Sequence, residues 1–381
     1  MSADGGGSKQ MAHPNSGPPY PPTTAALGGR PTVALDDPIC ACLLLLYVAA
    51  AITNMTIFQV NRRRDHKFFF SSVLFGFCMA RSTTLVLRIA WASHPTNINL
   101  AIAAGIFVQA GVLLLFIVNL VFAQRLLRSY HPRLGWSRGV GWAFQVLYFC
   151  VLAMLIMVIT ATVDSFFTLN TGTRRIDRDI QLFVGTVLAA LAFLPIPVTI
   201  LAVVVPRPRS QQQLPEKFGQ GRHRTKLWLL LFTSAILTLG AGFRIGVNFT
   251  HPRPATDPAW FHSKPCFYCF NFVIELVVVY TYVISRFDRR FHVPDGSSGP
   301  GHYSGVRVVD SGKRKKDGGT AVGGWEVNRE MDVFGDESKG DDLSDQNNRR
   351  ETDWEAKATE ELNRDTVGSF GSELAYLQND V

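Results

Sequence analysis

Seven long apolar stretches fill most of the chain between residues 38 and 285, and they constrain its fold more than any other feature. Each can cross a hydrocarbon core roughly 30 Å thick, which needs about 20 helical residues. The stretches are apolar on all sides, whereas a helix of a soluble bundle shows one polar face. The sequence therefore predicts an all-α membrane protein, a seven-transmembrane-helix bundle. The expected spans lie near residues 38–60, 68–92, 98–122, 140–162, 180–205, 226–249 and 267–285.

Lysine and arginine are unevenly distributed among the segments that connect these spans. The segments on one side of the predicted membrane carry seventeen of them, and those on the other side carry seven. Because basic segments stay in the cytosol, we expect the N-terminus outside and the C-terminus in the cytosol. The net charge is +8, but this placement indicates an anionic lipid bilayer as the partner rather than nucleic acid.

The two ends of the chain differ from its middle in composition. Residues 1–37 are rich in Gly, Pro, Ser and Thr, without the pattern of a signal peptide, and predict a disordered extracytoplasmic segment. Residues 294–381 are acidic and poor in large apolar residues, which predicts a disordered cytosolic tail. Residues 38–293 should form the membrane domain of a multi-pass protein, in the plasma membrane or an endomembrane.

Four ionisable residues fall inside predicted spans, where charge is expensive and often functional: Arg81, Arg88, Arg244 and Glu275. Arg81 and Arg88 are seven residues apart, which puts them on one helix face about 10 Å apart. Arg244 and Glu275 belong to neighbouring spans and are expected to pair. Asp164, at the end of the fourth span, is then the nearest spare acid for the other two arginines.

Two interpretations of these charges remain open. In the first, a cavity with surplus positive charge opens outward and binds an anionic ligand, such as a carboxylate or a lipid headgroup. In the second, the arginines are structural: they bind helix carbonyls, Gln109 and Asn271, or extend toward the membrane surface.

Three further patterns lie in the spans and at their outer ends. Pro195 and Pro197 lack backbone donors and should kink the fifth span. Gly242 and Gly246 form a GxxxG motif, which we expect to allow close packing within the bundle. Four cysteines at the outer ends of two spans could form a disulfide or remain free thiols, and without further ligands they predict no metal site: Cys40, Cys42, Cys266 and Cys269.

Several seven-helix classes are excluded by missing residues. Retinal proteins need a lysine in the last span, and residues 267–285 contain none. The acidic-Arg-Tyr motif and the Asn-Pro-x-x-Tyr motif of class A receptors are also missing. No catalytic motif is complete, so we expect neither an enzyme nor a cofactor.

A resemblance to a known family rests on residues 67–136. KFFFSSVLFGFCMARSTTLVLRIAWA at 67–92, AIAAGIFVQAG at 101–111, LFIVNLVFAQR at 115–125 and HPRLGW at 131–136 resemble a family of uncharacterised fungal seven-helix proteins. Its members are often labelled family-C-like G-protein-coupled receptors. The resemblance implies a seven-helix membrane protein without an assigned ligand.

Two functions remain after these exclusions. Receptor-like sensing of a small or lipidic, anionic ligand is favoured by the topology, the basic inner loops and the long tail, which could bind cytosolic signalling proteins. A transporter or lipid-translocating protein is the alternative, favoured by the arginines within the membrane and by the proline-broken fifth span.

Overall fold

The computed structural model describes residues 17–21, 24–64, 68–206, 216–294, 297, 299–300 and 302–304. Within these ranges every regular element is a helix, and the only extended pairing is an isolated bridge between Thr24 and Pro254. Seven helical stretches are long and apolar enough to cross a membrane. The prediction of an all-α bundle with seven membrane helices is therefore confirmed.

The spans are longer than their apolar centres. Helical turns continue past the apolar residues at most ends, and side chains of Asn97, Ser137 and Asn170 cap three helices by accepting from backbone N–H groups. The spans are α1 (Val33–Arg63), α2 (Phe69–Ser93), α3 (Ile98–Tyr130), α5 (Arg138–Phe167), α6 (Thr171–Phe193) with α7 (Pro195–Val204), α8 (His223–Phe249), and α9 (Lys264–Tyr268) with η3 (Cys269–Val273) and α10 (Ile274–Ile284). Four short helices connect or follow them: α4 (Pro132–Gly135), η2 (Trp260–His262), α11 (Phe287–Arg290) and η4 (His302–Ser304).

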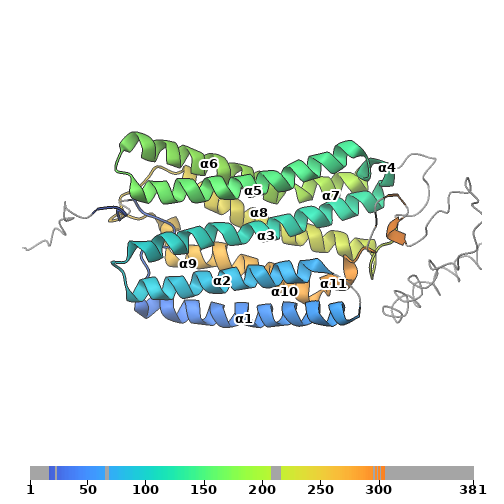
Figure 1. The fold of residues 1–381 in the computed structure, drawn as a ribbon, viewed down its shortest axis with the longest axis horizontal. Helices are drawn as coiled ribbons and strands as arrows, with labels where there is room; N and C mark the ends of the chain where they lie inside the picture. The colour runs from blue at the N-terminus through green and yellow to red at the C-terminus, as the bar shows by residue number, and fades with distance from the viewer. Residues whose placement is uncertain are drawn as a thin grey trace, which may run out of the picture. The chain divides into compact units, whose positions relative to one another are not determined.

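The helices run side by side, and α3 lies in the middle of the bundle (Figure 1). On one side α3 packs against α2, which packs against α1; on the other it packs against α5, α7 and α8. We call the end that holds Val33 the amino end, and the end that holds α11 the carboxyl end. Large apolar side chains point away from the bundle, among them Leu45, Phe149 and Ile284. Such an apolar exterior defines an integral membrane protein.

Two of the spans are irregular. The fifth breaks at Leu194, between α6 and α7, because Pro195 and Pro197 carry no backbone N–H. The seventh contains one π-helical turn, η3, which shifts the backbone by one residue between α9 and α10. The prediction of a kinked fifth span is confirmed, whereas the π turn has no evident signature in the sequence.

A buried polar cluster joins three spans in the carboxyl half of the bundle. The Tyr282 hydroxyl of α10 donates to Asn119 Oδ1 of α3 and lies 3.1 Å from Thr233 Oγ1 of α8. Asn119 Nδ2 donates to Ser234 Oγ at 3.0 Å. All four side chains are buried, and in a membrane interior such bonds hold helices together where apolar burial gives no net gain.

The structure corrects the expected boundaries at both ends of the membrane domain. α1 begins at Val33 rather than near residue 38, and residues 24–32, expected within a disordered segment, lie against the amino end through hydrogen bonds. After α11, Tyr303 is buried against Trp136 and Phe218, so packing continues past residue 293. The rest of the predicted tail, residues 305–381, lies outside the described residues, as do residues 1–16.

Replacing Tyr282 with Phe should destabilise the bundle, because Asn119 Oδ1 would lose its donor in a buried place. A lost buried hydrogen bond costs about 1–3 kcal/mol. Thermal unfolding in detergent or nanodiscs measures the effect. Tyr280→Phe is the matched control, since its hydroxyl donates to Leu46 O at an exposed position. Equal melting temperatures for the two variants would contradict the role given to the Tyr282 cluster.

Candidate functional site

Two clusters of charged side chains lie along α2, in the amino half of the bundle. The deep cluster consists of Arg81, Arg244, Asn271 and Glu275. The end cluster consists of Asp36, Arg88, Lys264 and Tyr268. Both clusters join α2 to the seventh span; the deep cluster also reaches α8, and the end cluster reaches α1.

In the deep cluster, Arg81 and Glu275 form a two-pronged ion pair. Arg81 Nε lies 2.5 Å from Glu275 Oε2, and Arg81 Nη2 lies 2.6 Å from Glu275 Oε1. Arg81 Nη1 donates to the carbonyl of Val108 on α3 at 2.9 Å. Both side chains are buried, with exposed fractions of 0% for Arg81 and 1% for Glu275. Two parallel charge-assisted bonds are the geometry that can offset the desolvation of both groups.

The bundle has a space shaped for the Arg81 guanidinium. A Cβ atom at Gly111 of α3 would lie 3.0 Å from Arg81 Cζ, which is tighter than ordinary van der Waals contact, so the glycine leaves room for the guanidinium. The rings of Phe77 and Phe272 lie on other sides, with centroids 5.6 and 5.4 Å from Arg81 Cζ. The guanidinium is therefore enclosed by an anion, a carbonyl and aromatic rings.

Arg244 is held more loosely than Arg81. Its Nη1 lies 3.3 Å from Glu275 Oε1 and 3.4 Å from Asn271 Oδ1, and 18% of its side chain is exposed. The expected contact between Arg244 and Glu275 is present, but Arg81 holds the carboxylate more closely. The expectation that Arg81 lacks a carboxylate within the membrane was wrong.

The π turn positions this part of the seventh span. It leaves the carbonyl of Phe272 available to the Tyr47 hydroxyl of α1, which donates to it at 2.8 Å. It also brings the carbonyl of Phe270 near α8, where a Cβ at Gly240 would meet it at 3.2 Å. The irregular turn and the glycine together let α8 approach η3, beside the contact between Arg244 and Asn271.

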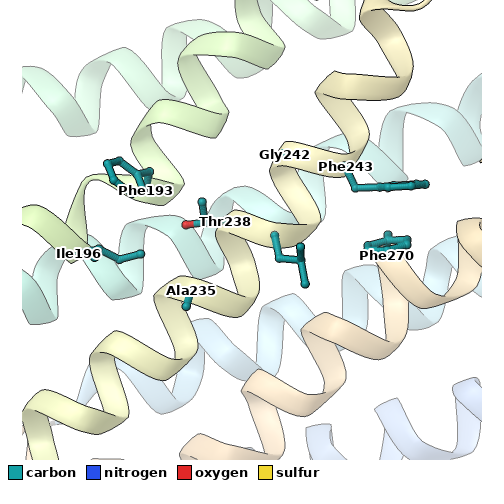
Figure 2. A pocket seen from close by; sticks show the side chains of 8 residues that line it. Phe193, Ile196, Ala235, Thr238, Gly242, Phe243 and Phe270 are labelled. Atoms are coloured by element: carbon teal, nitrogen blue, oxygen red, sulfur yellow. The ribbon is translucent and has the colours of Figure 1, made fainter.

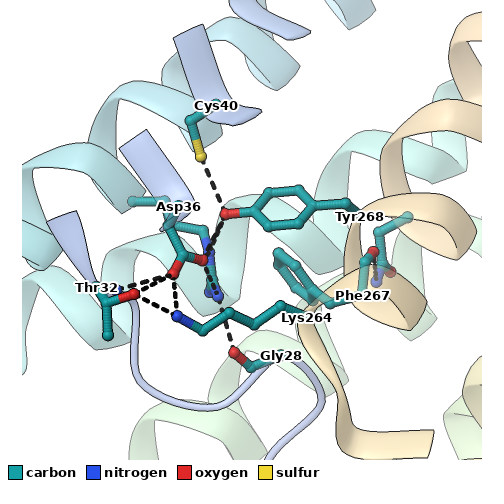
Figure 3. A network of polar contacts seen from close by, with 9 residues as sticks. Gly28, Thr32, Asp36, Cys40, Lys264, Phe267 and Tyr268 are labelled. Carbon is teal, nitrogen blue, oxygen red and sulfur yellow. Dashed lines mark hydrogen bonds and ion pairs between the residues drawn. The ribbon is translucent and has the colours of Figure 1, made fainter. Parts of the chain in front are cut away.

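In the end cluster, the Asp36 carboxylate accepts hydrogen bonds from the donor groups that surround it (Figure 3). Asp36 Oδ1 accepts from Arg88 Nη2 at 3.0 Å and from the Tyr268 hydroxyl at 2.6 Å. Asp36 Oδ2 binds the Lys264 ammonium and the backbone N–H of Thr32. Asp36 is thus both the counter-ion of two cations and a cap for the first turn of α1.

Asp36 corrects the prediction that Asp164 would be the spare acid for Arg81 and Arg88. Arg88 also lies over the ring of Phe267, with its Cζ 4.1 Å from the ring centroid. Sequence reasoning missed Asp36 because it placed the first span after residue 37. The pattern Thr32-x-x-x-Asp36, a cap just before an apolar run, is the signal that could have found it.

Residues 24–32, which we call the strap, cross the amino end over the end cluster. Ala25 N donates to Arg253 O at 2.8 Å, and Gly28 N donates to His262 O at 3.0 Å. Gly28 O accepts from Arg88 Nη2 at 3.0 Å. Gly28 has φ +81° and lies against the Phe267 ring, where a Cβ would come within 2.5 Å, so this position requires glycine. Burial, with a smaller contribution from Arg253, lowers the pKa of the His262 side chain.

None of the cysteines forms a disulfide in the structure. All six have free thiols here: Cys40, Cys42, Cys78, Cys150, Cys266 and Cys269. A disulfide among the four outer cysteines stays a prediction. Cys40 Sγ lies 3.1 Å from the Tyr268 hydroxyl, beside the end cluster. Among the described residues no group of three His, Cys, Asp or Glu side chains is placed to hold a metal ion.

Each cluster contains two cations and one carboxylate, and the second cation is partly accessible. In the deep cluster this cation is Arg244, and in the end cluster it is Lys264, with 18% and 22% of their side chains exposed. Arg81 and Arg88 are enclosed, at 0% and 5%. The four predicted residues are thus divided: Arg81, Glu275 and Arg244 meet in one cluster, whereas Arg88 belongs to the other.

Fold and site together define an integral membrane protein with seven helices and two buried ion-pair clusters. The model of a family described as "Protein of unknown function (DUF3112)" matches residues 210–292, which include α8, the seventh span, Arg244, Lys264 and Glu275. No curated protein and no solved structure matches the chain. Since the matched range lies outside residues 67–136, the resemblance to receptor-like proteins stays a prediction.

Glu275→Gln should destabilise the protein strongly, because it leaves the enclosed Arg81 without an anion. Removing one partner of a buried ion pair costs about 3–5 kcal/mol. The double variant Arg81→Gln/Glu275→Gln should recover part of this loss, since the uncompensated charge is then gone. Thermal unfolding of the purified variants provides the measurement.

The control for this experiment is Asp257→Asn. Asp257 pairs with Arg253 at 3.5 Å, but both side chains are at least half exposed, so little change is expected. A Glu275 variant as stable as the Asp257 variant would show that the deep cluster does not hold the helices together.

Proposed function

We propose that the protein is a receptor-like membrane protein that binds an anionic amphiphile at the amino end of its bundle. The observation that carries this proposal is the pair of partly exposed cations, Arg244 and Lys264. Each shares a carboxylate with an enclosed arginine, so each cluster has one positive charge more than it has negative charges.

The two cations are held differently. Arg244 makes only long contacts, whereas Lys264 is held closely by Asp36 and Thr32. An anion at either cation leaves the pairs Arg81–Glu275 and Arg88–Asp36 in place. Asn271, which binds Arg244, follows Lys264 by seven residues, or about 10 Å along a helix. A phosphate or carboxylate head could bind at these positions while its alkyl chain stays in the bilayer. The two enclosed arginines then act as structural residues.

The clusters connect the proposed ligand site to the packing of α1, α2 and the seventh span. They tie α2 to α1 and to the seventh span, and an anion that draws Arg244 or Lys264 away changes the charge balance at these contacts. A ligand shifts a conformational equilibrium only through such differential contacts. In this proposal the N-terminus is outside and the carboxyl end faces cytosolic signalling proteins, in the plasma membrane or an endomembrane.

A transporter or lipid-translocating protein is the second candidate, and the break between α6 and α7 favours it. Broken helices provide hinges and unpaired carbonyls in many transporters. Here the Thr238 hydroxyl of α8 lies within bonding distance of Ala192 O, at 3.1 Å, next to the break. This bond ties the break to α8 beside Phe193 and Ile196 (Figure 2), so the fifth span can act as a hinge only if the bond opens.

Arg244→Gln and Lys264→Gln should weaken the binding of anionic amphiphiles about tenfold or more, since each removes a charge-assisted contact. Oleoyl lysophosphatidate is the anionic probe, and monooleoylglycerol, with the same chain, is the neutral one. The shift in melting temperature of nanodisc samples measures binding, because a ligand of the folded state raises it. Arg133→Gln, at the exposed carboxyl end, is the control.

Equal shifts with both probes, or no effect of either substitution, would overturn the anionic site. Two further assays separate the functional classes. Ligand-dependent nucleotide exchange on a co-reconstituted G protein supports the receptor, and protein-dependent movement of the probe across vesicles supports the transporter.

A further inference from the structure

A buried histidine, His262, lies at the amino end in the short helix η2, between α8 and α9. Its exposed fraction is 8%, and its ring atom Nδ1 is buried without a hydrogen-bond partner. The Phe261 ring lies against it, with ring centroids 4.5 Å apart. A neutral imidazole can occupy such a place at modest cost. An imidazolium carries a full charge and a second N–H donor, so it would be strongly disfavoured there.

The charged groups around His262 offer it no anion. The elements beside η2 are the loop that precedes it, α9 and the strap. In the loop, Arg253 repels a charge on the ring, and Asp257 already pairs with Arg253. Lys264 of α9 and Arg30 of the strap are cations themselves. Burial and repulsion together explain why the pKa of the His262 side chain lies below its ordinary value.

The same loop holds the strap by two backbone hydrogen bonds. Gly28 N donates to His262 O at 3.0 Å, and Ala25 N donates to Arg253 O at 2.8 Å. On its other side, Gly28 O accepts from Arg88 Nη2 at 3.0 Å, so its carbonyl reaches into the end cluster (Figure 3). Gly28 therefore links η2 to the end cluster, and a displacement of η2 also displaces the strap.

We propose that His262 is a pH-sensitive latch: protonation of its ring moves η2 toward water and frees the strap from the end cluster. An imidazole in water has a pKa of about 6.5, and the closed form holds the pKa of His262 below that value. The closed form is therefore fully stable above about pH 7. It loses stability relative to the open form as the pH falls below about 6.5, by at most about tenfold per pH unit.

Opening of the strap has a consequence for ligand entry. When Gly28 O leaves Arg88, an N–H group of this arginine becomes available to an anionic head group. This consequence rests on the proposed function, whereas the latch itself does not. Release of the strap can therefore be measured without any ligand.

Hydrogen–deuterium exchange of the full-length protein in phosphatidylcholine nanodiscs tests the latch. Strap peptides that contain Ala25 and Gly28 should lose protection about threefold or more between about pH 7.5 and about pH 5.5, after correction for intrinsic exchange rates. The loss should be confined to the strap and to residues 250–263. The spans should keep their protection, because they contain none of the released hydrogen bonds.

Variants of His262 separate the latch from other effects of acid. His262→Gln and His262→Leu both remove the titrating ring, so strap protection should become independent of pH in each. A polar and an apolar replacement are used together, and their melting temperatures verify that they fold. His251→Gln is the matched control, because His251 is an exposed histidine of the same loop, and it should keep the wild-type response.

A wild-type strap that is equally protected at both pH values would overturn the latch. So would a full pH response in either His262 variant, or the loss of this response in His251→Gln. Loss of protection throughout the spans would show acid unfolding instead of strap release. These outcomes are independent of anion binding at Arg244 and Lys264, which the lysophosphatidate assay tests separately at neutral pH.

Discussion

The two-pronged ion pair between Arg81 and Glu275 is the interaction on which the amino half of the bundle depends. A lone guanidinium at this depth would be very costly, and the carboxylate, the Val108 carbonyl and the rings of Phe77 and Phe272 together offset that cost. Two neighbouring features accommodate this pair: Gly111 leaves room for the guanidinium, and the π turn ends two residues before Glu275. The aromatic rings, the glycine and the irregular helical turn thus all surround the ion pair between Arg81 and Glu275.

Much of the fold could be predicted from the sequence because the bilayer allows few backbone structures to cross it. A segment that spans it must satisfy its backbone internally and present apolar side chains, so length and hydropathy identify each span. The kink at Pro195 also follows from local chemistry, since proline lacks a donor. The π turn in the seventh span could not be predicted in this way, because its contacts are with Tyr47 and Gly240, which belong to other spans. The GxxxG motif at Gly242 and Gly246 faces outward, since a Cβ at either glycine would meet no atom within 4 Å, so the expectation that it packs within the bundle was wrong.

The candidate site was predicted in part. The cost of charge in lipid singled out Arg81, Arg88, Arg244 and Glu275, and all four lie in the two clusters. Their pairing was not predictable, since it depends on helix rotation and on where each helix begins. Asp36 and Lys264 were missed because they lie at helix starts, outside the apolar stretches. Charged residues at helix starts thus contribute to the end cluster as much as those within the spans.

The sequence separation of the Arg81–Glu275 pair has a consequence for how the protein is assembled during synthesis. The two residues are 194 positions apart, so α2 enters the membrane long before its counter-ion has been made. Until the seventh span arrives, Arg81 must be held by water or by the insertion machinery. A ribosome-bound chain that ends before α9 therefore carries an uncompensated charge in its second span. The last span completes the bundle both electrostatically and geometrically, which couples membrane insertion to translation of nearly the whole helical domain.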